Sequence, residues 1–137
     1  TRSFHVTGVQ TCALPIFDTN ILVRFLVRDE NTQFEKARKL LKRAVSNGRR
    51  IFINLLVLLE TEWVLRSRYS LSKQEMLEMI SGLLDASDLQ IEDEPAVEEA
   101  LFIWRDSNAD FADCLIGARN RQLGCKSTAT FDISNKN

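Results

Sequence analysis

The pattern of hydrophobic and polar positions alternates between short apolar runs and stretches with a helical period. The short runs predict strands at residues 50–54, 89–93 and 125–131, and the helical period predicts helices in the stretches between them. Strands that alternate with helices indicate βαβ units and a parallel sheet. We therefore expect a single α/β domain, in which helices flank a parallel β-sheet as an α/β/α sandwich.

Capping residues mark where the expected helices begin and end. Asp18 or Asn20 opens the first helix, and Asn54 opens a nearly buried helix over residues 55–69. The remaining signals are capping-box pairs, a proline in a first turn and closing glycines: Thr32 with Glu35, Gly48, Ser72 with Glu75, Pro95, and Gly124 after a helix that ends at Leu123. The spacing places the two tryptophans, Trp63 and Trp104, in the core.

Composition excludes several kinds of chemistry. The chain is 45% hydrophobic and 27% charged, with a formal net charge of -1, which is typical of a soluble globular protein. The sequence has no apolar run of the ~18 residues that a membrane-spanning helix needs. The three cysteines form no C-x-x-C pair, which favours a reduced, cytoplasmic protein. The single histidine, His5, lies in an irregular N-terminal stretch, so histidine-based nucleophilic or acid–base catalysis has no base. Catalysis is expected to depend on carboxylates.

Five carboxylates fall where the expected sheet would present a ligand site, beyond the carboxyl ends of its strands. Asp18 follows the position of the first strand, and Asp132 follows the last one; Asp110 and Asp113 open a helix at i, i+3 spacing, on one face. Each has a structural alternative: Asp18 as a helix cap, Asp110 and Asp113 as partners of the helix dipole, and Asp132 as a turn residue. Glu60 lies in the apolar helix.

Glu60 is the hardest of these residues to explain structurally, because apolar neighbours would leave its charge desolvated. Glu62 points ~200° away around the helix, so only one of the two faces the pocket, and we expect Glu60 to be the less exposed. A site built only from oxygen donors suits Mg²⁺ or Mn²⁺. A hard cation in an open carboxylate site activates water and neutralises phosphate, which indicates phosphodiester chemistry.

The stretches "FDTNILVRFLVRDE", "FINLLVLLETEWVLRSRY", "ADFADCLIGARN" and "TATFD" together resemble PIN-domain ribonucleases, in particular VapC-type toxins of bacterial type II toxin–antitoxin systems. The resemblance covers residues 17–133. It implies a Mg²⁺- or Mn²⁺-dependent endoribonuclease that forms a homodimer and binds a cognate antitoxin protein as well as RNA. It also implies roles for individual residues: catalytic and metal-binding Asp18, Glu60, Asp113 and Asp132, an additional metal ligand Asp110, and supporting Asn20 and Thr130.

Residues 1–16 differ from the rest of the chain and resemble the translation of a sequencing-library adapter. We expect them to be a non-native tail, followed by a PIN domain over residues 17–137 that lacks its native first strand and C-terminal end.

Basic residues and other protein classes complete the expectations. Arg24 and Arg28, four positions apart near Asp18, are candidates for contact with RNA or an acidic partner.

One alternative to a ribonuclease is a catalytically impaired PIN-like binding module. Another is an aspartate-rich phospho-acceptor signalling domain, which would need an acidic pair near the first strand and a lysine after the last strand; Asp132 stands at that second position.

Overall fold

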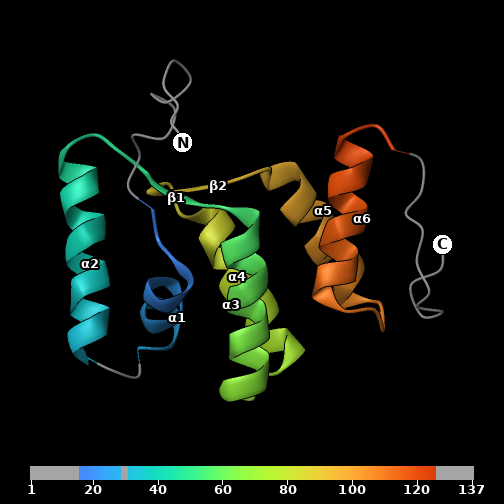
Figure 1. Ribbon diagram of the computed structural model, residues 1–137, viewed down its shortest axis with the longest axis horizontal. Coiled ribbons are helices and arrows are strands. Elements are labelled where there is room, and N and C mark those ends of the chain that lie inside the picture. Colours follow the sequence, from blue (N-terminus) through green and yellow to red (C-terminus); the bar gives the residue numbers. More distant parts are fainter. Residues whose placement is uncertain (1–15, 29–30, 126–137) are drawn as a thin grey trace, which may run out of the picture.

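The computed structural model of this chain describes residues 16–28 and 31–125 (Figure 1). Within this part of the chain lie six helices and two strands. In order they are α1 (Thr19–Val27), α2 (Asn31–Ser46), β1 (Ile51–Ile53), α3 (Leu55–Arg68), α4 (Lys73–Asp85), β2 (Leu89–Ile91), α5 (Glu94–Arg105) and α6 (Phe111–Gln122). The mixture of helices with a small parallel sheet confirms the α/β class, and none of these helices is both long and apolar enough to cross a membrane.

The sheet is parallel, as the alternation of strands and helices predicts. Strand β1 pairs with β2, with Ile51 opposite Leu89. Ile16 forms a parallel bridge to Phe52, and the backbone N–H of Phe17 donates to the Phe52 carbonyl oxygen at 3.2 Å. The segment before α1 therefore occupies the position of a strand beside β1, and α1 begins at the carboxyl edge of the sheet. The expected strands at 50–54 and 89–93 are confirmed, whereas that at 125–131 lies outside the described residues apart from its first.

The helix starts follow the capping signals of the sequence. Asp18, rather than Asn20, caps α1, since its side chain accepts a hydrogen bond from the Ile21 N–H at 2.9 Å. Asn54 caps α3 in the same way, through the Val57 N–H at 2.8 Å. Ser72 and Glu75 form the predicted capping box of α4, and Pro95 lies in the first turn of α5. These caps fix where α1 and α3 leave the sheet, and hence where their side chains meet.

The helices form a row in which α1 and α2 lie at one end, α5 and α6 at the other, and α3 and α4 between them (Figure 1). Trp104 is buried, as expected, and packs against Phe111 with ring centroids 5.0 Å apart. The prediction that Trp63 belongs to the core is wrong, because 51% of its surface is exposed. The helix α3 is not nearly buried either: only one of its faces packs inward, through Leu58, Thr61, Glu62 and Leu65.

Candidate functional site

A hollow of about 450 Å³ opens between the start of α1 and the outer face of α3. Four of the residues that the sequence singled out line it: Asp18, Asn20, Arg24 and Glu60. Residues that the sequence analysis did not single out, or assigned elsewhere, complete the wall: Thr19, Val23, Val57, Trp63, Val64, Arg68 and Tyr69. The hollow therefore combines two carboxylates, two guanidinium groups and two aromatic rings.

Two hydrogen bonds hold the carboxylates in this hollow. One oxygen of Asp18 accepts from the Ile21 N–H, which leaves the other oxygen available to a ligand. The hydroxyl of Thr19 donates to Oε1 of Glu60 at 2.7 Å, across a sequence separation of 41 residues. Thr19 thus ties the carboxylate on α3 to the first turn of α1, directly after Asp18. Asp18 and Glu60, two of the four carboxylates that were expected to converge, thus line one hollow.

The predicted exposures of Glu60 and Glu62 are wrong, because Glu60 is exposed and Glu62 is buried, with 4% of its surface accessible. The prediction assumed that the apolar neighbours of Glu60 would desolvate its charge. In the folded chain the buried face of α3 is the one that carries Glu62, about half a turn away, and Glu60 faces the open hollow. The two glutamates do face opposite sides of α3, as the helical geometry requires.

An ion pair accounts for the burial of Glu62. Nε of Arg66, one turn later on α3, lies 2.9 Å from Oε2 of Glu62. This hydrogen bond raises the pKa of the Arg66 guanidinium above its ordinary value, and the charge of Asp110 acts in the same direction. Glu62, Arg66 and Asp110 line a second hollow of about 300 Å³, together with residues that include Lys73 and Trp104. Asp110 therefore lies with Glu62 rather than with Glu60.

Asp110 and Asp113 stand at the beginning of α6, as predicted, but they do not join the Asp18–Glu60 hollow. The reason is that α6 packs mainly against α5, at the other end of the row of helices (Figure 1). Asp110 occupies the N-cap position of α6 without forming a capping hydrogen bond through its side chain, a position that suits the helix-dipole alternative. Asp113 lies in the first turn of α6 and is half-buried. Asp132 and Thr130 lie outside the described residues.

Cys114 follows Asp113 in α6 and is buried. Burial raises the pKa of its thiol, and the neighbouring charge of Asp113 raises it further. A thiol in such surroundings stays protonated near neutral pH and is a poor nucleophile. At the start of α6, carboxylates rather than the Cys114 thiol therefore remain the candidate reactive groups.

The donor atoms of the Asp18–Glu60 hollow show whether a divalent cation fits it. Two carboxylates and the side-chain amide of Asn20 line it. Mg²⁺ takes oxygen ligands and is commonly held by one or two carboxylates, while waters and substrate phosphates complete its shell. A hard cation therefore fits this donor set. Across the described ranges, no three His, Cys, Asp or Glu side chains come close enough together to hold a metal ion by themselves.

The two predicted arginines have different surroundings. Arg24 lines the hollow and donates from Nη1 to the Tyr69 hydroxyl at 2.8 Å, which fixes its guanidinium near Asp18. Arg28 is not among the lining residues; its guanidinium lies over the Phe34 ring, 5.0 Å from the centroid. Arg68 was not predicted. It lies at the end of α3, eight residues after Glu60 and ~80° further around the helix, so the helical period alone does not indicate it.

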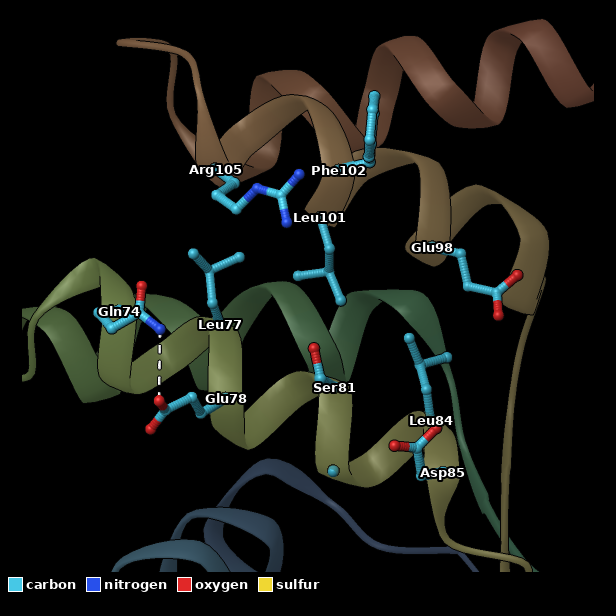
Figure 2. A pocket seen from close by; sticks show the side chains of 11 residues that line it. Gln74, Leu77, Glu78, Ser81, Leu84, Asp85, Glu98, Leu101, Phe102 and Arg105 are labelled. Atoms are coloured by element: carbon cyan, nitrogen blue, oxygen red, sulfur yellow. Dashed lines mark hydrogen bonds between the residues drawn. The ribbon is translucent and has the colours of Figure 1, made fainter.

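A larger hollow of the described chain has a different composition. It measures about 680 Å³ and lies between α4 and α5, where Leu77 and Leu101 point toward one another (Figure 2). Glu78, hydrogen-bonded by Gln74, stands at its rim, and Phe102 and Arg105 close its other side (Figure 2). None of the predicted site residues lines it. We therefore take the smaller Asp18–Glu60 hollow as the candidate active site.

Comparisons with known proteins agree with the resemblance that the motifs carry. The PIN domain matches residues 16–134, a range that contains all of the described hollow. The chain is also similar to a VapC ribonuclease of Aquifex aeolicus (strain VF5), with 22% identity over 118 residues, which are 86% of this chain and 87% of the relative. The family match spans most of the chain, and the relative matches over most of its own length. This chain therefore belongs to the PIN-domain family.

Proposed function

We propose that this protein is a Mg²⁺- or Mn²⁺-dependent endoribonuclease that hydrolyses RNA phosphodiester bonds, and that it is the toxin of a toxin–antitoxin pair. The observation that carries the proposal is the pairing of Asp18 with Glu60 in one hollow of a PIN-domain chain. The similarity to a VapC ribonuclease supports RNA as the substrate.

In this proposal Asp18 and Glu60 hold the cation. When bound there, a divalent ion supplies positive charge against the phosphate and activates water for attack. Thr19 keeps the Glu60 carboxylate oriented toward the hollow, and the Ile21 N–H does the same for Asp18. Asn20 supports the site from the same turn of α1.

The remaining predicted residues complete the proposed set. The family motifs, rather than the geometry, support catalytic and metal-binding roles for Asp113 and Asp132, a metal-binding role for Asp110 and a supporting role for Thr130. In the described structure Asp113 and Asp110 lie at the start of α6, apart from the Asp18–Glu60 hollow. A role for them at the same cation requires α6 to approach α1 more closely when RNA and metal are bound.

The partners follow from the similarity to VapC proteins. We propose that a cognate antitoxin protein blocks the hollow, that two copies of the chain form a homodimer, and that the protein works in the cytoplasm.

Cleavage of RNA by the purified protein, with Mg²⁺, with Mn²⁺ and with EDTA, tests the proposal. We expect cleavage that requires one of the two ions, and loss of cleavage in Asp18→Asn. Binding of Mn²⁺, followed by calorimetry, should weaken in the same variant and gives a second readout independent of catalysis. Cleavage that persists in EDTA contradicts the proposed chemistry. Absence of cleavage in a folded protein that still binds a partner favours the binding-module alternative.

A further inference from the structure

The helix α2 carries a concentration of positive charge that the net charge of -1 conceals. Residues 31–50 contain seven lysines and arginines against one acidic residue, whereas residues 73–105 contain nine acidic residues against two basic ones. The helix α2 forms one end of the row of helices, and α4 and α5 lie farther along the row (Figure 1). A polyanion that approaches the molecule is therefore attracted to the α2 end.

Four of these basic residues form one exposed side of α2, which we call the basic face: Lys36, Lys39, Lys42 and Arg43. They lie within about 120° of one another around the helix axis, at about 100° per residue. Ala37 and Ala44 are buried on the opposite side of the helix. Phe34 of α2 stacks on Phe25 of α1, with ring centroids 5.9 Å apart. The basic face therefore points away from the core and toward solvent.

No acidic side chain neutralises the basic face. Its four members form no ion pair with any residue that the structure describes, and Glu35, the one acid of α2, pairs with Arg38. Like charges four positions apart on a helix, such as Lys39 and Arg43, destabilise it. The helix dipole favours Arg43 in the last turn but does not explain Lys36 or Lys39 in the middle of α2. An anionic ligand does explain them, because it relieves the repulsion.

The Asp18–Glu60 hollow has no comparable excess of positive charge. The guanidinium groups of Arg24 and Arg68 are balanced there by the two carboxylates. No residue of α2 lines the hollow, but α1 packs against both α2 and α3. An RNA that extends from the hollow past α1 therefore comes to α2. Lysine and arginine side chains contact backbone phosphates whatever the base sequence.

We propose that the basic face of α2 is a second RNA-binding surface, separate from the hollow, which binds the phosphate backbone of an RNA that extends beyond the cleaved bond. This inference rests on the proposed function, because it takes RNA as the substrate. Two connected surfaces bind a ligand that spans both of them more tightly than either surface does alone. The basic face thus favours long RNA over short fragments without reading the base sequence.

Two double variants separate the position of the charge from its amount. Lys39→Gln/Arg43→Gln removes two positive charges from the basic face, whereas Arg105→Gln/Arg121→Gln removes two from α5 and α6, at the other end of the row (Figure 1). Binding of a labelled, unstructured RNA of ~20 nucleotides is measured in EDTA, where no cleavage is expected, over a range of KCl concentrations. An RNA of ~4 nucleotides, close to the shortest length that one binding site commonly covers, serves as the short ligand.

We expect the affinity of Lys39→Gln/Arg43→Gln for the long RNA to depend less steeply on salt. The slope of log K against log salt should fall by about 1.4, since each phosphate contact to a single strand contributes about 0.7. If the lines for variant and wild type meet at about 1 M salt, the loss of affinity at about 0.1 M is about 25-fold. Arg105→Gln/Arg121→Gln should lose much less, and the short RNA should bind all three proteins alike. In the cleavage assay the basic-face variant should raise KM for long RNA and leave kcat unchanged, because these contacts hold the substrate and the transition state alike.

Equal affinity of Lys39→Gln/Arg43→Gln and the wild type for the long RNA overturns the inference and leaves the basic face to an acidic protein partner. An equal loss in the two double variants also overturns it, because net charge and not the basic face would then account for the loss. The basic-face variant should keep the urea midpoint of the wild type, since it removes like-charge repulsion. If long RNA binds through the basic face but is not cleaved with Mg²⁺ or Mn²⁺, the proposed function fails and this inference stands.

Discussion

The ion pair between Glu62 and Arg66 makes an asymmetric prediction about stability. Nε of Arg66 lies 2.9 Å from Oε2 of Glu62, and the two side chains are 48% and 4% exposed. Removing the arginine leaves a carboxylate buried without its partner, whereas removing the negative charge leaves a guanidinium that water can reach. We therefore expect Arg66→Met to destabilise the protein much more than Glu62→Gln.

The magnitude follows from the burial of each partner. Breaking a fully buried pair costs about 3–5 kcal/mol, and the half-exposed guanidinium reduces this to about 2–3 kcal/mol for Arg66→Met. Methionine keeps the aliphatic stem of the arginine, so the measured cost reflects charge more than packing. Glu62→Gln keeps the size of the side chain and an oxygen that can accept from Arg66, and should cost about 1 kcal/mol. Lys73 cannot easily replace Arg66, because its ammonium donates to the carbonyls of Trp104 and Ser107.

Urea unfolding followed by circular dichroism measures these free energies by linear extrapolation. Arg38→Met is the matched control: Arg38 pairs with Glu35 at 3.0 Å on α2, but both side chains are about half exposed, at 51% and 47%. An exposed pair contributes little, so this variant should cost less than ~0.5 kcal/mol. If Arg66→Met costs no more than Arg38→Met, or no more than Glu62→Gln, the reasoning from burial is refuted.

Three further predictions concern α6, α3 and α4. Asp113→Asn should abolish Mn²⁺-dependent RNA cleavage, and Asp110→Asn should reduce the cleavage rate less. Asp113→Asn should leave the free energy of unfolding unchanged or higher, because it removes like-charge repulsion. A wild-type cleavage rate for Asp113→Asn contradicts this prediction. The buried Thr61 hydroxyl has no hydrogen-bond partner in the described structure, so Thr61→Val should raise the free energy of unfolding by about 1 kcal/mol; a clear loss of stability speaks against it. Hydrogen bonds from Ser72 lower the pKa of the Glu75 carboxyl below its ordinary value of 4.5. The wild type should therefore be more stable than Glu75→Gln above pH 4.5, and this advantage should disappear as the pH falls through the lowered pKa. A stability difference that does not change with pH contradicts this prediction.

Much of the fold could be predicted because the signals are local. Asn54 caps α3 and the Ser72–Glu75 capping box opens α4, as their sequence context indicates, since each cap depends only on the next three residues. The pairing of Asp18 with Glu60 follows from a parallel sheet, which brings the beginnings of α1 and α3 to one edge.

The exposures of Glu60, Glu62 and Trp63 could not be predicted in the same way. The helix α3 is apolar on almost every side in the sequence, so the helical period does not reveal which face packs inward. Tertiary contacts determine which face of α3 is buried. The packing of α1 leaves an open hollow in front of Glu60, while the ion pair with Arg66 compensates the charge of the buried Glu62. The separation of Asp110 from Asp18 likewise depends on the packing of α6 against α5, which no spacing along the chain encodes.

A side-by-side comparison of Glu60→Gln and Glu62→Gln tests the central claim most directly. The two substitutions are chemically identical, and they lie two residues apart on opposite faces of α3. The account predicts that Glu60→Gln loses Mg²⁺- or Mn²⁺-dependent RNA cleavage while its urea midpoint stays close to that of the wild type. It predicts that Glu62→Gln keeps cleavage at temperatures where it is folded, with a lowered midpoint. Wild-type cleavage by Glu60→Gln, together with loss of cleavage by a folded Glu62→Gln, would contradict the assignment of the Asp18–Glu60 hollow as the active site.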